Sequence, residues 1–479
     1  MVHKPGLYVL LILIIIMTMI GGFTEKTLRE MYGGGASDSN IVYEDLEEHM
    51  KSYDLNTDDG LYWYVNDKNS LDFYKLSKNY VRTSPEYYFI DQEIMPQIEC
   101  MNANQYINKD DILYNECKAS YELLVKKLDN FDWKKDITDS INEKNKELDE
   151  LKNFYSLGEI KESDYESGKD MIEFELELLN YRLKYEIPFS YNQEAYFLDS
   201  YTESYVMYSS MNPDENSYTS KEKLNAFREA KAEYFVNKYI VENDKISGEY
   251  DTDAVATNLK YSFSFYGATF LIIALVVIFG GMISDEISKG TIKQLLIKPY
   301  TRTKILSSKL IAGIIMFLIF AIMYALVNIV IYGAFTGGIA SLFENSVVYN
   351  FSTNSAVEIN NIMLILLNFV CIIPMFIIVI LFILFVNVIT SNSVASIISG
   401  FVLYMGSVLV IDMGYLSDSV TANAYLPIVN WDFSYYLFGG NHWLSHCNLT
   451  LSIIVTVVTI LILTIATYLI FNYKDIKNQ

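Results

Sequence analysis

The chain has 479 residues, of which 51% are apolar and 15% aromatic, and its net charge at neutral pH is −22. Residues 24–260 alone hold 27 basic and 50 acidic side chains, a net of −23, so the rest of the chain is close to neutral. Because so acidic a segment repels phosphates, composition excludes nucleic acid as a partner. The segregation of charge and apolar residues predicts an all-α membrane protein with six transmembrane helices. A large, mainly helical extracellular domain is expected between helices 1 and 2.

The first apolar run covers residues 6–23 and predicts a first transmembrane helix within residues 1–23. A cleaved signal peptide is the alternative, since the run has a basic start and a short apolar core. The end of the run, Ile20-Gly21-Gly22-Phe23, does not match the small-x-small pattern of a cleavage site. We therefore favour an uncleaved anchor.

Residues 24–260 are expected to form an acidic extracellular domain. Two stretches place apolar residues three, four or seven apart, which is typical of one helix face. The first stripe comprises Ile137, Ile141, Leu148 and Leu151, and the second comprises Ile172, Leu176, Leu179 and Leu183. Because a Ser-Leu-Gly turn separates them, they predict an antiparallel helical hairpin at about 137–187. Residues 61–65 are rich in Tyr and Trp, and they are interpreted as a strand.

The same segment contains two cysteines, Cys100 and Cys117, which are 17 residues apart. A disulfide between them is one alternative if the compartment is oxidising. Free thiols are the other, because spacing alone does not fix the geometry. Cys371 lies in an apolar run and is interpreted as a small core residue.

Residues 261–479 are expected to form a five-helix transmembrane domain. Five apolar runs are long enough to cross a bilayer. They lie at about 263–283, 305–333, 362–390, 394–413 and 449–471. Between Lys309 and Lys474 there is no Lys or Arg, a gap that is typical of membrane segments.

The basic residues predict the orientation, since cytoplasmic loops carry an excess of Lys and Arg. The short N-terminus has Lys4, the C-terminus has Lys474, and the loop at 284–304 is the other basic region. With six spans, these regions fall on one side. We therefore expect a multi-pass protein of the cell membrane with cytoplasmic N- and C-termini and residues 24–260 outside.

The cytoplasmic loop, residues 284–304, has a pattern beyond its charge. An acidic pair is followed by Gly-Thr, an apolar pair, a Pro and an Arg. These residues are Asp285, Glu286, Gly290, Thr291, Leu295, Leu296, Pro299 and Arg302. Thr291 can cap a short helix with the Leu pair on its apolar side, and Pro299 ends it. Positive-inside anchoring alone explains the Lys residues but not Gly290, the Leu pair or Pro299.

This stretch resembles the loop between the second and third spans in type-2 exporter permeases of ABC transporters. The family pattern is Glu, Gly-Thr, Leu-Leu, Pro, Arg and Lys, and Lys309 matches the last position. Six spans with cytoplasmic termini also fit, as does an aromatic loop at 425–443. Two features depart from the family: only Met1–Pro5 precede the first run, and the loop after it has about 235 residues instead of a short connection.

The resemblance implies that the loop is a coupling helix, which docks on a separate ABC ATPase subunit. It also implies a second permease subunit, identical or related, in the lipid bilayer. ATP would bind to the partner, so this chain would not be an enzyme and would hold no cofactor. No G-x-x-x-x-G-K-[ST] loop occurs in it. The alternative is a non-transporting surface protein, phage-receptor-like or secretion-accessory, whose extracellular domain is the functional part.

Two further features are candidate sites. His442, His446 and Cys447 have a spacing that could bind a metal, but an interfacial loop is favoured and no metal is expected. Asp412, near the end of the fifth run, is either an intramembrane acid or a solvated helix end.

Overall fold

The computed structural model describes residues 12, 14–24, 46–218, 220–246, 254–289, 291, 300–336, 338–413, 416–417 and 419–474. The chain is mostly helical, as predicted. It divides into two compact units, which are described separately. The outer unit is Thr27–Glu203, and the bundle unit joins Met1–Lys26 to Ser204–Gln479.

The outer unit is built of helices. They are α3 (Asp58–Ser77), α4 (Pro85–Phe89), η1 (Ile90–Ile94), α5 (Met95–Asn102), η2 (Ala103–Ile107), α6 (Asp111–Leu128), α7 (Trp133–Ser156) and α8 (Glu162–Tyr185). Side chains of α4, η1, α5 and α6 form its buried apolar cluster, which contains Phe89, Ile90, Ile94, Ile98 and Leu128. Asp110 and Asp132 accept hydrogen bonds from backbone N–H groups at the starts of α6 and α7, which satisfies donors that a helix N-terminus leaves free.

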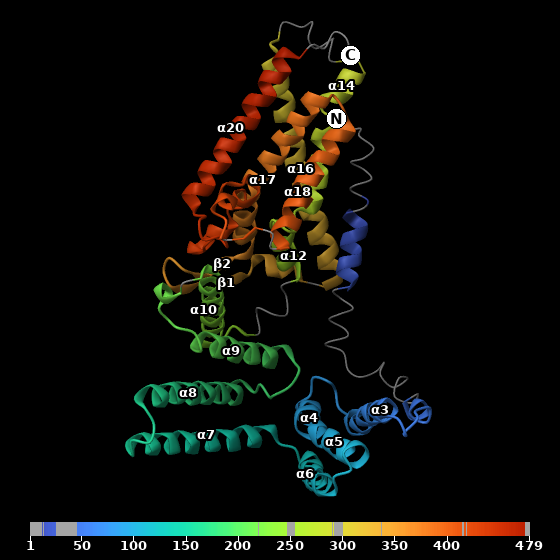
Figure 1. Ribbon diagram of the computed structural model, residues 1–479, viewed down its shortest axis with the longest axis vertical. Helices are drawn as coiled ribbons and strands as arrows, with labels where there is room; N and C mark the ends of the chain where they lie inside the picture. The colour runs from blue at the N-terminus through green and yellow to red at the C-terminus, as the bar shows by residue number, and fades with distance from the viewer. Residues whose placement is uncertain are drawn as a thin grey trace. The chain divides into compact units, whose positions relative to one another are not determined.

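Helices α7 and α8 form a helical hairpin within this unit (Figure 1). Ile137 of α7 and Ile172 of α8 are buried, so the apolar stripes face inward. Gly158 in the connection has φ +74°, a conformation that glycine adopts without a steric cost. Across the hairpin, Lys144 pairs with Glu175 at 2.7 Å.

The strand expected at 61–65 is wrong, because these residues lie inside α3. The Thr57 side chain accepts a hydrogen bond from the N–H of Gly60 and caps the helix. Asp58 and Asp59 occupy the first turn, where negative charge stabilises a helix. The helix cap at Thr57 and the acidic first turn therefore outweigh the strand propensity of the aromatic residues at 61–65.

The bundle unit contains most of the apolar helices. They are α12 (Ala254–Ser262), α13 (Thr269–Gly280), α14 (Ser284–Ser288), α16 (Arg302–Thr336), α17 (Asn361–Thr390), α18 (Ser393–Asp412), α19 (Pro427–Asn430) and α20 (Leu449–Tyr473). Short turns η3 (Glu215–Ser217), η4 (Gly338–Phe343), η5 (Thr421–Tyr425) and η6 (Ser434–Gly439) belong to it as well.

Five helices among the described residues are long and apolar enough to cross a membrane. They are Thr269–Ile287, which joins α13 to α14, and α16, α17, α18 and α20. By length and composition, these are the helices of a multi-pass membrane protein. The first predicted span corresponds to a shorter apolar helix, Ile14–Thr24.

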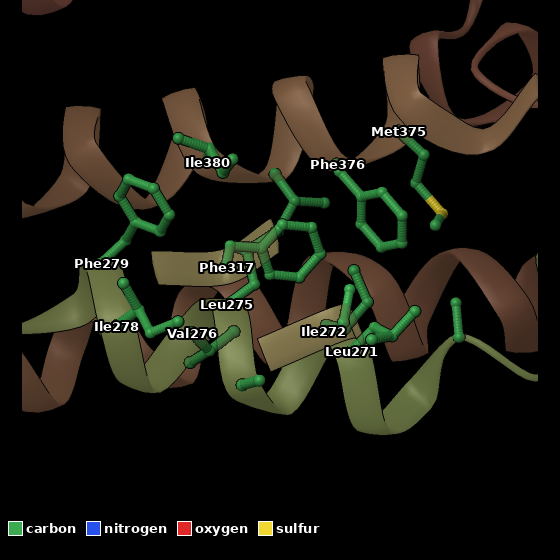
Figure 2. Close-up of a cluster of buried hydrophobic side chains, with 14 of the residues drawn as sticks. Leu271, Ile272, Leu275, Val276, Ile278, Phe279, Phe317, Met375, Phe376 and Ile380 are labelled. Carbon is green, nitrogen blue, oxygen red and sulfur yellow. The ribbon is translucent and has the colours of Figure 1, made fainter. Parts of the chain in front are cut away.

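Helix α13 lies at the centre of the bundle unit and packs against α16, α17 and α18. Figure 2 shows its side chains meeting Phe317 of α16 and Phe376 of α17. Gly313 and Gly400 allow this approach, because a Cβ at either position would collide with side chains of the neighbouring helices. The buried core of this unit is therefore arranged around α13.

The boundary between the two compact units falls between Glu203 and Ser204, within the segment 24–260 that is predicted to be extracellular. Helix α9 (Gln193–Ser209) runs from one unit into the other, and α10 (Lys221–Glu242) belongs to the bundle unit. The reason is a β-hairpin between α16 and α17. Its strands are β1 (Asn345–Asn350) and β2 (Ser355–Asn360), which pair antiparallel with Val348 opposite Val357.

Helix α10 is fixed to this hairpin by polar and aromatic contacts. The Tyr239 hydroxyl donates to Glu358 at 2.8 Å, and Lys245 forms an ion pair with the same carboxylate. The rings of Phe235 and Tyr349 stack with centroids 5.6 Å apart. These contacts join α10 to the hairpin that lies between α16 and α17.

Candidate functional site at the loop end of the bundle

The loop end is the end of the bundle unit at which α14, the start of α16 and the last turns of α17 and α20 meet (Figure 1). The helical run breaks after Gly280 and resumes at Ser284 as α14. Asn387 of α17 bridges the break. Its amide nitrogen donates to the carbonyls of Phe279, at 3.3 Å, and Gly280, while its oxygen accepts from the Ser284 N–H at 2.9 Å.

This asparagine is fully buried among apolar helices. Backbone groups at a helix break must find partners, since an unpaired buried N–H or C=O costs about 1–3 kcal/mol. Asn387 supplies both a donor and an acceptor there. The position of α14 is therefore fixed by α17.

Glu286 of α14 is paired with Lys309 of α16. The ammonium lies 2.5 Å from Glu286 Oε1, and the two side chains are 11% (Lys309) and 29% (Glu286) exposed. A partly buried pair of this kind is screened less than a surface pair. The other oxygen, Glu286 Oε2, is buried and accepts no hydrogen bond from the residues that the structure describes. The pair joins α14 directly to the helix on the far side of the loop.

Arg302 is the first residue of α16, and its guanidinium caps α20. Nη1 donates to the backbone carbonyls of Phe471 at 3.1 Å, Asn472 at 3.0 Å and Lys474 at 2.7 Å. A cation at a helix C-terminus satisfies free carbonyls and interacts favourably with the helix dipole. The start of α16 is thereby fixed to the end of α20.

Lys474, directly after α20, caps α17 in the same way. Its ammonium donates to the Val388 carbonyl at 2.5 Å, the Ile389 carbonyl at 3.1 Å and the Ser391 hydroxyl at 2.5 Å. Two successive cations therefore link three helices at one end of the bundle. Together with Asn387, they connect α14, α16, α17 and α20.

The arrangement is suited to transmitting a displacement. A force on residues 289–300 would reach α14 on one side and the start of α16 on the other. The Glu286–Lys309 pair joins α14 to α16. Arg302 then joins α16 to α20, and Lys474 joins α20 to α17, each by capping a helix end.

The predicted loop residues are placed as follows. Asp285 and Glu286 lie in α14, and Arg302 starts α16. The Thr291 hydroxyl donates to the Glu286 carbonyl at 3.4 Å. Gly290, Leu295, Leu296 and Pro299 lie outside the described residues. Arg302 also has the capping role described above.

Sequence reasoning missed Asn387 and the capping role of Lys474. A signal was available for the first, because Asn387 is a strongly polar residue in an otherwise apolar run. No signal pointed to Lys474, since its partners are backbone carbonyls of a helix 85 residues earlier.

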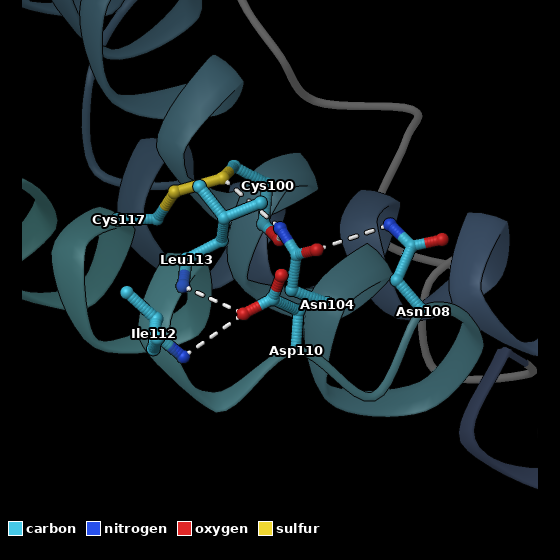
Figure 3. The surroundings of a disulfide bond; sticks show 7 residues. All are labelled: Cys100, Asn104, Asn108, Asp110, Ile112, Leu113 and Cys117. Atoms are coloured by element: carbon cyan, nitrogen blue, oxygen red, sulfur yellow. Dashed lines mark hydrogen bonds between the residues drawn. A yellow bond between two sulfur atoms is a disulfide. The ribbon is translucent and has the colours of Figure 1, made fainter.

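Cys100 and Cys117 form a disulfide in the outer unit (Figure 3). Their Cα atoms are 6.1 Å apart, and the bond joins α5 to α6. Nearby, Asn104 donates to the Cys100 carbonyl at 2.9 Å. The bond closes the turn that contains the Asp110 cap.

In the cluster of His442, His446 and Cys447 before α20, His442 is buried and His446 is exposed. His442 is 1% exposed, and both ring nitrogens contact the backbone. Nδ1 accepts from the Leu444 N–H at 3.0 Å, and Nε2 lies 3.1 Å from the Val429 carbonyl. His442 therefore has no ring nitrogen left for a metal.

Asp412 is the last residue of α18 and is exposed.

The fold and the loop end define a multi-pass helical membrane protein whose spans are linked by polar caps. Residues 226–477 match the family model described as "Protein of unknown function (DUF2705)". The match covers more than half of the chain, so the chain belongs to this family. It includes most of α10, the β-hairpin and all five long apolar helices. No curated protein and no solved structure matches the chain.

Proposed function

We propose that this chain is the membrane-spanning permease subunit of an ATP-driven ABC exporter. In this account a separate ATPase subunit docks on the loop between α14 and α16, and its ATP-driven movement is passed to the spans. The observation that carries the proposal is the Glu286–Lys309 pair. It joins the two helices that border the loop, as a device that transmits force requires.

The capping contacts support the same reading. An anchor that only holds a domain at the membrane does not need every helix at the loop end to be linked to the others. Here, Arg302 and Lys474 link three helices, and Asn387 links a fourth. In addition, the buried Glu286 Oε2 is an acceptor for a donor from the loop or from a docked partner.

The proposed topology has six spans, with Ile14–Thr24 belonging to the first. Both termini and the loop end are cytoplasmic, and residues 24–260 are extracellular. The basic residues Lys289, Arg302, Lys304 and Lys309 at the loop end support this orientation. The disulfide of the outer unit supports an oxidising compartment for that part of the chain.

The proposed partners are the ATPase, which binds ATP, and a second permease subunit. Apolar side chains on the surface of α20, such as Ile454, Leu461 and Ile465, are exposed by 53–56% within the single chain. This surface is suited to lipid or to another membrane helix. This chain itself would supply no catalytic group.

A second candidate function is a non-transporting surface protein whose outer unit is the functional part. The observation that favours it is the size of that unit, which has its own buried apolar cluster. In this case the loop end would be a structural closure of the bundle only.

Affinity purification of the tagged protein from mild detergent, followed by an ATPase assay, separates the two. If the proposal holds, a subunit with a P-loop co-elutes with the wild type. Glu286→Ala and Gly290→Pro then weaken its binding or its stimulation. Absence of any P-loop subunit under several extraction conditions would contradict the exporter reading.

A charge swap supplies the control. Glu286→Lys alone should break the ion pair with Lys309. Glu286→Lys with Lys309→Glu restores an ion pair in which the two charges have exchanged places. If the ion pair transmits force, the double variant recovers a substantial part of the ATPase stimulation. If Glu286 acts only by contacting the partner itself, the double variant is no better than the single one.

A further inference from the structure

A cavity of about 360 Å³ lies in the outer unit, between α4, the end of α6, the start of α7 and the segment after α8. Its volume is within the range of small-ligand sites. Aromatic rings form much of its wall: Tyr88, Phe89, Phe131, Trp133 and Phe189. Aromatic rings attract a cation placed near their faces, so a lining of this kind favours a cation.

The polar lining is strongly acidic. Four carboxylates border the cavity, namely Glu93, Asp136, Asp139 and Glu143, against a single cation, Lys127. Lys127 pairs with Asp136 at 2.8 Å. Among the residues that the structure describes, no Lys or Arg forms an ion pair with the other three carboxylates. The cavity therefore keeps an excess of three negative charges.

The wall already holds cations in one recurring arrangement, a ring with a carboxylate beside it. The Lys127 ammonium lies 5.1 Å from the centre of the Phe89 ring and is paired with Asp136. The Arg182 guanidinium lies 4.2 Å from the Phe189 ring and 2.7 Å from Asp199. A third instance, at the rim, has Lys134 at 5.4 Å from the Trp133 ring and paired with Glu186.

The cavity lining also contains rings and carboxylates that are not paired with a cation of the described residues. Tyr88 and Phe131 line it, and no cation lies over either ring within the described part of the chain. Glu93, Asp139 and Glu143 supply the charge. Asp139 and Glu143 are one turn apart on α7, both exposed, so the acidic surface continues out of the cavity along this helix.

We propose that this cavity, with the Asp139–Glu143 surface of α7, binds a basic peptide through a Lys or Arg side chain. One such side chain enters between the aromatic rings, and a second basic residue of the peptide meets the exposed carboxylates. A peptide fits better than a small ammonium ion, because the acidic surface extends beyond the cavity. The net charge of −23 over residues 24–260 favours the same partner. The inference does not depend on the transport proposal.

The test uses the full-length protein in a non-ionic detergent. The probe is a fluorescein-labelled synthetic peptide of alternating Gly and Lys, and its fluorescence anisotropy is measured at low and at physiological salt. The wild type should bind this peptide and not the matching Gly-Glu peptide. Asp139→Asn with Glu143→Gln should weaken binding about ten-fold, since two charge contacts are lost.

The matched control is Asp149→Asn with Glu150→Gln. It removes the same charge from the same helix, at positions that do not line the cavity. Binding should stay within about two-fold of wild type in this control. Tyr88→Leu, which keeps an apolar side chain but removes the ring, should also weaken binding several-fold.

Three outcomes would overturn the proposal. The first is no binding by the wild type even at low salt. The second is that the control double variant weakens peptide binding as much as Asp139→Asn with Glu143→Gln does. This result would mean a general attraction to an acidic domain. The third is competition by N-acetyl-lysine amide at the same concentration as the peptide, which would assign the cavity to a small ammonium ligand. A failed exporter test would leave each of these results unchanged.

Discussion

Arg302 donates a hydrogen bond to the backbone carbonyl of Lys474 at 2.7 Å, and the ammonium of Lys474 itself caps α17. Arg302 therefore fixes the backbone of Lys474, whose side chain caps the next helix. The two residues are 172 positions apart in the sequence, yet they close the same end of the bundle. This relay connects three helix ends, the start of α16 and the ends of α17 and α20, around the loop.

Arg302→Gln should loosen this frame. The variant loses up to three charge-assisted hydrogen bonds to carbonyls, and we expect a loss of stability of about 2 kcal/mol. Thermal unfolding in detergent measures the change. Lys304→Gln is the control, because Lys304 is exposed and belongs to the same segment. An equal change in the two variants would contradict the capping role.

Asn387→Leu should be more damaging. It leaves the carbonyls of Phe279 and Gly280 and the N–H of Ser284 without their partner at a buried helix break. We expect a cost of about 3 kcal/mol, measured by thermal unfolding. Asn328→Leu is the matched control. Asn328 is 3% exposed, and it donates within its own helix to Tyr324. If both variants unfold at the same temperature, Asn387 does not fix the joint.

Reduction of the Cys100–Cys117 bond should destabilise the outer unit. The cysteines are 17 residues apart, and a closed loop of this length contributes about 3 kcal/mol in the chain-entropy model. Limited proteolysis with and without a reductant, followed by identification of the cut sites, tests this. Cuts between α5 and α6 should appear on reduction and equally in Cys100→Ser with Cys117→Ser. A cutting pattern that reduction does not change would contradict the expectation.

The contact between α10 and the β-hairpin should depend on pH. Hydrogen bonds from Lys245, Tyr239 and Asn345 hold the pKa of Glu358 at about 2, below its usual value of 4.5. A lowered folded-state pKa means that the stabilisation is complete above about pH 4.5 and is lost as the pH falls toward 2. Because the pair is partly exposed, we expect an effect of about 0.5 kcal/mol.

The measurement compares wild type with Glu358→Gln at pH 7 and pH 3 by thermal unfolding. The wild type should be more stable than the variant at pH 7, and the difference should shrink at pH 3. A difference that is constant between these pH values would show that Glu358 does not act through its charge.

The apolar helices could be predicted from the sequence, because a span is defined by its own composition. The run expected at 362–390 became Asn361–Thr390, and the run at 449–471 became Leu449–Tyr473. The stripes of α7 and α8 were also visible, since a helix face repeats every three or four residues. Local patterns of this kind need no knowledge of the rest of the chain.

The contacts that build the loop end could not be predicted in the same way. Arg302 and Lys474 bind backbone carbonyls, and a carbonyl leaves no mark in the sequence. The hairpin β1–β2 was missed because its twelve strand residues are bracketed by two membrane helices, whose apolar signal is far stronger. The packing of α10 against this hairpin was missed for the same reason.

The central claim is that the loop at 284–304 contacts an ATPase subunit, and site-specific photo-crosslinking in cells tests it most directly. A benzophenone amino acid is placed at Leu295 and, as a control, at Leu157, which lies in the connection between α7 and α8. The account predicts that Leu295, and not Leu157, crosslinks to a polypeptide that mass spectrometry identifies by its P-loop sequence. No P-loop polypeptide at Leu295, or the same adducts at both positions, would contradict it.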